Sequence, residues 1–444
     1  MPPTPDRARR LAFDALRRVN GEGAYANLAL AELLDARQLP ARDAAFATEL
    51  VAGTCRAQGT YDLVLSAAAG RPTSSLQPAV LDLLRLGCHQ LLATRVPAHA
   101  AVAATVDLAG ATVGRRVTGL VNAVLRRVAE HDLAGWVDRL TEGQDERDRL
   151  AVATSHPRWI VDAIADQLPE SELETALRAD NGSAPVHLAV RPGVAEVGEL
   201  AAAGAEPGRY SPYAARWSGN PADLPAVREG RAGVQDEGSQ LVADALVRVE
   251  APAGPWLDMC AGPGGKTALL AGLVGPDALL VATEVAPHRA ALVRQAVRAY
   301  PSPPPVLVAD GTRPPWRPAT FARVLVDAPC TGLGALRRRP ESRWRRQPAD
   351  VEPLHRLQLA LLASAVDSTV RGGMVGYVTC SPHRRETVDV VAETLAGRDD
   401  VEVVPAGRLL PATIEDATIG DFVQLWPHRH GTDAMFAAYL RRRG

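Results

Sequence analysis

Two cysteines stand directly behind short apolar runs, in surroundings where a purely packed thiol is a poor choice. Cys330 lies in the stretch LVDAPCTGLG (325–334), and Cys380 ends the stretch GYVTC (376–380). Apolar runs of this length, bounded by turn residues, are typical of buried strands, so we expect both thiols at strand ends. A thiol in such a place can act as a nucleophile, as a metal ligand or as an ordinary buried group.

The cysteine pattern of the whole chain weighs against the metal. The five cysteines are odd in number, widely spread and without a CxxC pair: Cys55, Cys88, Cys260, Cys330 and Cys380. Neither a disulfide framework nor a standard zinc site has this pattern. We therefore expect no metal, and a chemical role for Cys330 and Cys380.

A glycine-rich stretch, LDMCAGPGGKT (257–267), reads as a strand, a tight turn and the start of a helix. A P-loop would need glycine at Cys260, and the dinucleotide fingerprint would need a third glycine at Thr267. The class that remains is S-adenosylmethionine (SAM), whose amino-acid part would pack against this turn. The predicted cofactor contacts are Cys260, Ala261, Gly262, Pro263, Gly264, Gly265 and Lys266.

Acids at three further predicted strand ends support SAM. Glu284 follows the glycines at about 20 residues, the spacing of an acid that accepts hydrogen bonds from ribose hydroxyls. Asp310 and Asp327 end the next two predicted strands, with Asp310 placed to read an adenine edge. Three carboxylates would repel a pyrophosphate but suit a sulfonium cation that carries an ammonium group. Three unrelated turn acids would explain the repeated spacing less well.

Lys266 is the single lysine of the chain beside 48 arginines, out of 49 basic residues in total. Because an ammonium is compact and a guanidinium is planar, a lone lysine indicates a position where arginine does not fit. Chance survival is the alternative.

Two thiols, an acid and a SAM site form a plausible set for one reaction. Carbon 5 of a pyrimidine is a weak nucleophile, and it becomes an enamine carbon once a thiolate adds to C6. A carboxyl such as Asp327 could then stabilise the charge that develops on the N3 and O2 side. If the two cysteine strands are neighbours, Cys330 and Cys380 face the same site.

The elements that must position these residues divide the chain of 444 residues into three predicted parts. Residues 1–135 read as an all-helical domain, with Leu11, Ala12, Ala15 and Leu16 on one helix face. Residues 136–235 read as a helical connector and a small α/β (RRM-like) subdomain. Residues 236–444 alternate strands and helices, which predicts an α/β fold with a parallel doubly wound sheet.

The densest basic run is RRRPESRWRRQP (337–348), with Trp344 among six arginines. It could follow RNA phosphates and stack a base, or it could be a solvated surface loop. The net charge of −2 gives no global attraction to nucleic acid, so RNA binding would depend on such patches. No apolar run reaches a membrane span of about 18 residues, so we expect a cytoplasmic protein without membrane contact. We also expect a monomer.

The motifs resemble the RNA 5-methylcytosine methyltransferases of the NOL1/NOP2/Sun class, most closely the bacterial 16S rRNA methyltransferase B family (RsmB/Sun/Fmu). The matching stretches are DMCAGPGGKT (258–267), DAPCTGLG (327–334), RRRPESRW (337–344), YVTCSPHRRE (377–386), VQDEGSQL (234–241) and PHRHGTDAMF (427–436). The helical N-terminal part resembles the NusB RNA-binding domain through FATELVAGTCR, LLRLGCHQLL and VNAVLRRV. Where the family usually has Arg-Val-Asn, this chain has Ala189-Val190-Arg191.

The resemblance implies a Rossmann-like SAM-dependent domain that methylates C5 of a cytidine in 16S rRNA or an assembling small subunit. It implies that Cys380 is the nucleophile, that Cys330 helps to release the product, and that Asp327 and Lys266 contact the reacting base. It also implies that Glu284, Arg289, Asp310 and Asp327 hold SAM together with residues 260–266. In DNA cytosine-5 methyltransferases the Pro-Cys thiol attacks, so Cys330 is a rival nucleophile.

Two other classes of function stay open on the sequence. The chain could be a non-catalytic RNA-binding or antitermination-like factor with a relic methyltransferase domain, although both motif cysteines and the acids are intact. It could also be a small-molecule SAM methyltransferase, which would need neither the cysteine pair nor the helical domain. The N-terminal helices could bind RNA or serve only stability.

Overall fold

The computed structural model describes residues 6–275 and 278–443, and these residues divide into two compact units. The first unit consists of Met1–Gly182 with Leu336–Arg346, and the second of Ser183–Ala335 with Gln347–Gly444. Within the described ranges, no helix has the length and apolar character needed to cross a bilayer. The division of the chain at residues 135 and 235 stays a prediction.

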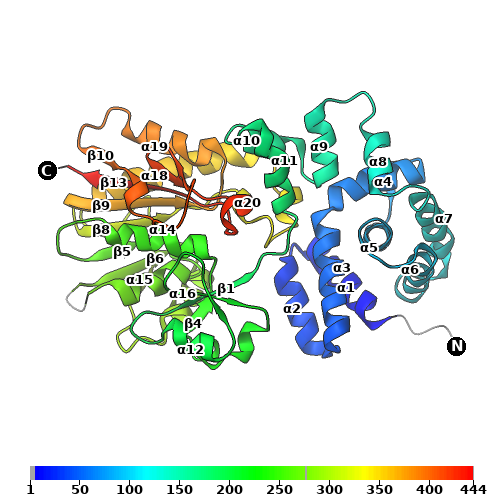
Figure 1. Cartoon of the computed structure of the whole chain (residues 1–444), viewed down its shortest axis with the longest axis horizontal. Helices are drawn as coiled ribbons and strands as arrows, with labels where there is room; N and C mark the ends of the chain where they lie inside the picture. The colour runs from blue at the N-terminus through cyan, green and yellow to red at the C-terminus, as the bar shows by residue number, and fades with distance from the viewer. Residues whose placement is uncertain (1–5, 276–277, 444) are drawn as a thin grey trace. The chain divides into compact units, whose positions relative to one another are not determined.

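The first unit is entirely helical (Figure 1). Its helix α1 begins after Asp6, whose side chain accepts a hydrogen bond from the backbone N–H of Arg9, and ends at Gly23 in the left-handed conformation. The predicted apolar face of α1 is fully buried. The helices are α1 (Arg7–Glu22), α2 (Ala26–Arg37), α3 (Ala41–Arg56), α4 (Gln58–Ala69), α5 (Pro78–Ala93), α6 (Ala98–Thr112), α7 (Thr118–Val128), α8 (Leu133–Leu140), α9 (Glu146–Thr154), α10 (Arg158–Ala165) and α11 (Glu170–Ala179).

The basic run is part of this helical unit, and for its central residues Arg343 and Trp344 both interpretations from the sequence are wrong. Arg343 is fully buried and donates hydrogen bonds to the carbonyl oxygens of Ser155 and Asp180 and to the side chain of Asn181. The indole N–H of Trp344 donates to the carbonyl of Arg56 at 2.9 Å. Neither side chain is available to follow phosphates or stack on a base. The segment, which includes the short helix α17 (Ser342–Arg345), anchors the chain in the first unit.

The second unit begins with a small four-stranded antiparallel sheet in the order β2-β3-β1-β4. The predicted strand in PVHLAVRPG is confirmed as β1, and its residues Leu188 and Val190 lie in the core of this subdomain. The elements are β1 (Val186–Val190), α12 (Val197–Ala202), β2 (Glu206–Pro207), β3 (Ala214–Trp217), α13 (Pro225–Arg228) and β4 (Ala232–Val234).

The larger sheet of the second unit has nine strands in the described residues, and its central part is parallel. The five predicted strands are confirmed in the order β9-β8-β5-β6-β7, and every neighbouring pair among them is parallel. Their bounds are β5 (Trp256–Asp258), β6 (Leu280–Glu284), β7 (Val306–Val308), β8 (Phe321–Asp327) and β9 (Thr369–Thr379). Because β8 and β9 are neighbours, the residues that follow them share one edge of the sheet.

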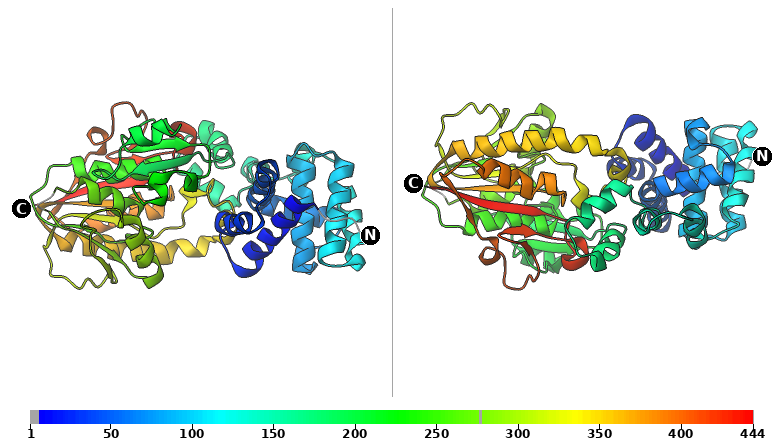
Figure 2. Two further views of the ribbon diagram at one scale, coloured as in Figure 1. Left: turned by 90° about the horizontal axis from the view of Figure 1, so that it is seen from below. Right: turned by 90° about the horizontal axis from the view of Figure 1, so that it is seen from above.

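Helices cover both faces of this sheet (Figure 2). Leu325 of β8 packs in one apolar core with Leu241, whereas its neighbours Val324 and Val326 pack in another with Leu361. Successive strand residues point to opposite faces, so these two cores are the two sides of a doubly wound fold. The helices are α14 (Glu237–Arg248), α15 (Gly265–Leu273), α16 (Pro287–Val297), α18 (Val351–Ser368) and α19 (Val388–Leu395).

The sequence analysis missed an antiparallel extension beside β9. Strand β13 pairs with β9 in antiparallel register, with Phe436 opposite Thr379, so the sheet is mixed rather than purely parallel. These strands are short or end in arginines, which weakens their apolar signal. The extension consists of β10 (Val401–Val404), β11 (Thr418–Ile419), β12 (Phe422–Gln424) and β13 (Phe436–Arg442), with the short helix α20 (Pro427–His430) between β12 and β13.

Candidate active site

The glycine turn between β5 and α15 lies against the end of β6. A Cβ atom at Gly262 would lie 2.2 Å from the Oε2 atom of Glu284, so only glycine allows this approach. Gly264 has a φ of 110°, a left-handed conformation that a side chain would strain. The left-handed conformation therefore favours glycine at 264, and the close approach to Glu284 favours glycine at 262. The hydrogen bond from Gly262 to Glu284 holds the turn against the end of β6.

Glu284 is the last residue of β6 and is almost completely buried. Its Oε2 accepts a hydrogen bond from the N–H of Gly262 at 3.2 Å, and its Oε1 accepts one from Ala286 at 3.0 Å. Arg289 donates to the carbonyl of Gly262 at 2.7 Å, with its Nε 3.6 Å from Glu284. This predicted acid and arginine are thus brought together around the glycine turn.

Asp310 stands two residues beyond β7 and is more open than Glu284. Its Oδ1 accepts hydrogen bonds from the backbone and the hydroxyl of Thr312. These bonds, chiefly that from the hydroxyl, lower the pKa of the Asp310 carboxyl. A carboxylate so ordered keeps oxygen lone pairs for a further donor.

Lys266 and Asp327 form an ion pair, with 2.8 Å between Nζ and Oδ2. Lys266 is the second residue of α15, and Asp327 is the last residue of β8. Burial alone would lower the pKa of Lys266, but the charge of Asp327 and their hydrogen bond outweigh it, so the net shift is upward. The lone lysine is therefore a buried, charged ammonium paired with Asp327.

The two thiols face each other, with 3.5 Å between the Sγ atoms of Cys330 and Cys380. Cys380 follows β9 directly, and Cys330 is three residues beyond β8. The backbone of Gly334 donates a hydrogen bond to the carbonyl of Cys380 at 2.9 Å. A Cβ at Gly334 would lie 2.0 Å from the carbonyl oxygen of Ala434, so glycine in CTGLG permits this close packing.

The surroundings favour the thiolate on Cys380. A hydrogen bond from the Cys330 thiol and the positive charge of Lys266 lower the pKa of Cys380, against burial and the charge of Asp327. The same hydrogen bond and burial raise the pKa of Cys330 well above its usual value. The pair therefore consists of a more acidic thiol, Cys380, and a thiol donor, Cys330.

The other three cysteines have no such setting. Cys55 and Cys88 are fully buried in the helical unit, and burial raises the pKa of both thiols. Burial also raises the pKa of Cys260 in the glycine turn. Of the five thiols, only that of Cys380 has a lowered pKa.

Glu386 joins the two cysteine loops and was not singled out by the sequence analysis. Its fully buried carboxylate accepts hydrogen bonds from the N–H and hydroxyl of Thr331, the hydroxyl of Ser381 and the amide of Gln358. Thr331 and Ser381 each directly follow one of the two cysteines. An isolated acid in the stretch SPHRRE has no periodic signal that would reveal this role.

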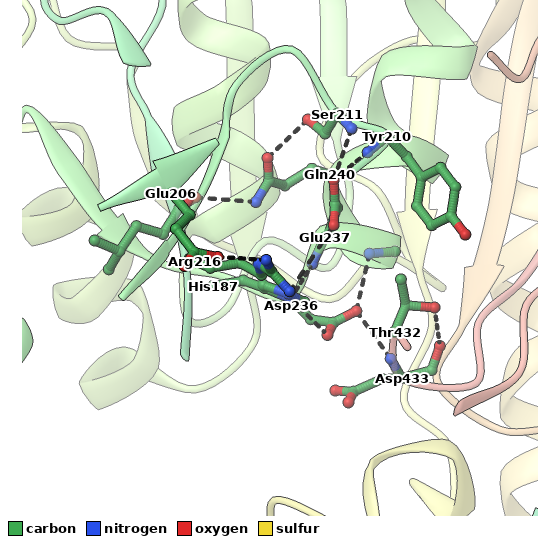
Figure 3. A network of polar contacts seen from close by, with 12 residues as sticks. His187, Glu206, Tyr210, Ser211, Arg216, Asp236, Glu237, Gln240, Thr432 and Asp433 are labelled. Carbon is green, nitrogen blue, oxygen red and sulfur yellow. Dashed lines mark hydrogen bonds and ion pairs between the residues drawn. The ribbon is translucent and has the colours of Figure 1, made fainter. Parts of the chain in front are cut away.

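A second network, around Asp236, holds the segment after α20 (Figure 3). The Oδ1 atom of Asp236 accepts hydrogen bonds from the backbone N–H groups of Gly238 and Asp433, at 2.9 and 3.0 Å. His187 of the small sheet lies 3.4 Å from the other oxygen of Asp236. The charge of Asp433 raises the pKa of Cys380, which places this acid in the electrostatic field of the thiols.

The hydrogen-bond acceptors around the glycine turn fit SAM. Each oxygen of Glu284 accepts one backbone N–H and keeps capacity for a ribose hydroxyl. Asp310 and Asp327 are both partly accessible, at 36% and 27% of their side chains. Carboxylates ordered by Lys266, Arg289 and Arg313 offer acceptors to the hydroxyl, amine and ammonium groups of SAM.

Two family models match the chain. The model described as 16S rRNA methyltransferase RsmB/F matches residues 247–441, and the NusB family model matches residues 6–130. The two ranges cover the sheet with its cysteine loops and most of the helical unit.

Curated relatives match over almost the whole chain. "Putative methyltransferase Rv1407" of Mycobacterium tuberculosis is 53% identical over 98% of this chain and 97% of its own length. The ribosomal RNA small subunit methyltransferase B of Pseudomonas putida is 34% identical over 87% and 88%. The probable enzyme of the same name from Bacillus subtilis is 29% identical over 98% and 99%.

Solved structures share the fold. The crystal structure of PH0851 has a TM-score of 0.83, with 24% identity over 99% of both chains. NSun6 from Pyrococcus horikoshii, solved with SFG, has a TM-score of 0.55, with 17% identity over 65% of this chain and 98% of that one. The identity and coverage of the curated relatives, with the matched family models, show that this chain is a SAM-dependent methyltransferase of the RsmB/F family.

Proposed function

We propose that this protein transfers a methyl group from SAM to carbon 5 of a cytidine in 16S rRNA, through a covalent bond between Cys380 and C6. The observation that carries the proposal is the setting of Cys380, whose sulfur lies 3.5 Å from the Cys330 sulfur and whose pKa is lowered by that thiol and by Lys266. The names of the curated relatives support rRNA as the substrate.

Cys380 begins the reaction as the nucleophile. Its thiolate forms a bond to C6, and the electron pair of the C5–C6 double bond moves to C5 and the polar edge of the ring. Carbon 5 then forms its bond to the methyl group that SAM supplies when bound, while the methyl–sulfur bond breaks and its electron pair stays on the sulfur of the departing thioether. The lowered pKa of Cys380 increases the fraction of thiolate at neutral pH.

Asp327 and Lys266 hold the polar edge of the base during this addition. The ammonium of Lys266 can donate hydrogen bonds to the carbonyl oxygen O2 and to N3, and the carboxylate of Asp327 can accept one from the exocyclic amine. Their ion pair orients both groups before the base arrives. Groups ordered in advance stabilise developing charge without reorganisation.

Cys330 acts in product release. The C5 proton leaves to a base, the electron pair of the C5–H bond re-forms the C5–C6 double bond, and the Cys380 thiolate is expelled. Cys330 is placed to donate a hydrogen bond to that departing sulfur. Its raised pKa keeps it a neutral donor rather than a second thiolate.

The cofactor contacts follow from the same edge of the sheet. We assign the SAM amino-acid part to residues 260–266, the ribose hydroxyls to Glu284, which Arg289 supports, and the adenine edge to Asp310. Asp327 would then stand between the cofactor side and the base.

A methylation assay with sequence readout tests the proposal. The purified protein is incubated with SAM and either 16S rRNA or small subunits from a strain that lacks this enzyme. Bisulfite sequencing should show one newly protected cytidine, absent when Cys380→Ala replaces the protein. A methyl group on another atom or another RNA, with 16S rRNA unmodified, would contradict the proposal.

A further inference from the structure

A pocket of about 270 Å³ lies in the second unit between the small antiparallel sheet and α16. Figure 1 shows β1, β4 and α16 next to one another at this place. The pocket borders the glycine turn through Pro263, but none of the reacting groups lines it. Its lining includes Arg191, Gly233, Pro263, Leu292, Gln295 and Arg298.

Arg191 directly follows β1 and is 4% exposed. Its Nε and Nη1 atoms have no hydrogen-bond partner among the described residues. Burial lowers its pKa to about 10, so the guanidinium stays charged at neutral pH. A buried charge without an anion is costly, so such a group calls for a ligand.

The backbone around the pocket lies close to the guanidinium groups of Arg191 and Arg298. A Cβ at Gly233 would lie 2.4 Å from the Nη2 atom of Arg191, so a larger residue there would displace the guanidinium from its present place. Arg298 donates to the carbonyls of Arg228 and Gln295, at 2.6 and 2.9 Å, which holds it at the same pocket. The residues that line the pocket include no carboxylate, so the two positive charges are not neutralised there.

We propose that this pocket binds a phosphate group, held by Arg191 with support from Arg298. A phosphate offers several acceptor oxygens to the Arg191 guanidinium at the pocket, and a charge-assisted bond to a guanidinium is among the strongest in proteins. The volume admits a phosphate with part of a sugar, but it is below the range of whole-ligand sites. The phosphate belongs either to an RNA backbone or to a free phosphate or nucleotide.

Binding of inorganic phosphate to the full-length protein is the first test. The ³¹P NMR signal of phosphate should broaden when the protein is present. Phosphate should also raise the unfolding temperature of the protein more than acetate and chloride of equal ionic strength do. Arg191→Met should abolish both effects, whereas Arg371→Ala should leave them unchanged, because Arg371 is exposed on β9 and outside the pocket. Equal effects of phosphate, acetate and chloride would overturn the proposal.

A second pair of variants does not depend on the buried arginine. Leu292 is 51% exposed on α16 and lines the pocket, so changes there should leave the fold intact. Leu292→Glu should weaken phosphate binding about tenfold through like-charge repulsion, and Leu292→Gln should not. Equal affinity of the two variants would contradict the proposal.

The source of the phosphate is decided with a short labelled single-stranded RNA in the absence of SAM. If the pocket holds an RNA phosphate, Leu292→Glu should weaken RNA binding and abolish competition by free phosphate. The slope of log K against log salt concentration should fall by about one, the value for one lost phosphate contact. If it holds a free phosphate or a nucleotide, RNA binding should be unchanged in both variants. Neither assay involves methyl transfer, so the pocket and the catalytic mechanism stand or fail separately.

Discussion

Lys266 in the second unit and Arg343 in the first are both buried cations, but their charges are balanced in different ways. Lys266 lies 2.8 Å from the carboxylate of Asp327 at the edge of the sheet. Arg343 donates only to neutral oxygens, two of them backbone carbonyls. An ion pair beside a thiol can stabilise charge that appears during a reaction, whereas a cation locked among carbonyls holds chain segments together.

Of the two buried cations, Lys266 should have the larger effect on methyl transfer. Lys266→Arg keeps the charge, but the planar guanidinium cannot occupy the space of an ammonium beside Asp327. We expect methyl transfer to fall by about 10²–10³-fold, the usual cost of one preorganised electrostatic group. The measurement is the single-turnover rate with SAM and rRNA. Arg371→Lys, the reverse exchange at an exposed site, is the control, and an equal loss in both variants would contradict the role.

Arg343 should affect stability and leave chemistry alone. Arg343→Met would strand the carbonyls of Ser155 and Asp180 and the amide of Asn181 in a buried site. We expect a loss of about 3 kcal/mol or more in the free energy of unfolding of the helical unit. The measurement is urea denaturation of the full-length protein. Below its unfolding transition the variant should keep its transfer rate.

Arg339→Met serves as the matched control for Arg343, because Arg339 belongs to the same basic run but is exposed. Its effect on stability should stay within about 0.5 kcal/mol. If Arg339→Met weakened RNA binding while Arg343→Met did not affect stability, the run would be an RNA surface after all.

Glu386 provides an intermediate case, a buried anion held by neutral donors within the active-site region. Glu386→Gln would set an amide N–H against the donors of Thr331 and Ser381 and loosen both cysteine loops. We expect kcat to fall about tenfold to a hundredfold, with the KM for SAM unchanged, because misplaced groups slow the chemical step. Glu393→Gln, on an exposed acid of α19, is the control. A change confined to KM would contradict a positioning role.

The smallest effect should be a shift in a pH profile. Lys266 lowers the pKa of Cys380, so the alkylation rate of this thiol should rise with pH at a lower pH than for an ordinary cysteine. Lys266→Met removes the positive charge, raises the pKa of Cys380 and should move the profile to higher pH. The readout is iodoacetamide labelling of Cys380 by mass spectrometry. An unchanged pH profile would contradict the role of Lys266 in stabilising the thiolate.

The parallel sheet and its edge could be predicted because their signals are local. Each strand is a short apolar run that ends in Glu284, Asp327 or Cys380, and the rule that parallel strands align their carboxyl ends brings these residues together. Lys266 was found by its rarity. The antiparallel strands after β9 lacked such signals.

The central residues of the basic run, Arg343 and Trp344, were misread because the composition of the run is the same for a surface and for an anchor. Nothing in RRRPESRWRRQP shows that Arg343 meets Ser155 and Asn181, which are more than 160 positions away. The same holds for Arg191, whose missing partner is visible only in three dimensions. Contacts between distant segments decide whether a cation is catalytic, structural or ready for a ligand.

The proposed mechanism requires that Cys380, and not Cys330, attacks the base. The decisive measurement is denaturing gel electrophoresis of Cys380→Ser and Cys330→Ser after incubation with SAM and rRNA. Cys380→Ser should form no covalent adduct and transfer no methyl group, whereas Cys330→Ser should accumulate a protein–RNA adduct that is not released. An adduct with Cys380→Ser and none with Cys330→Ser would make Cys330 the nucleophile and contradict the account.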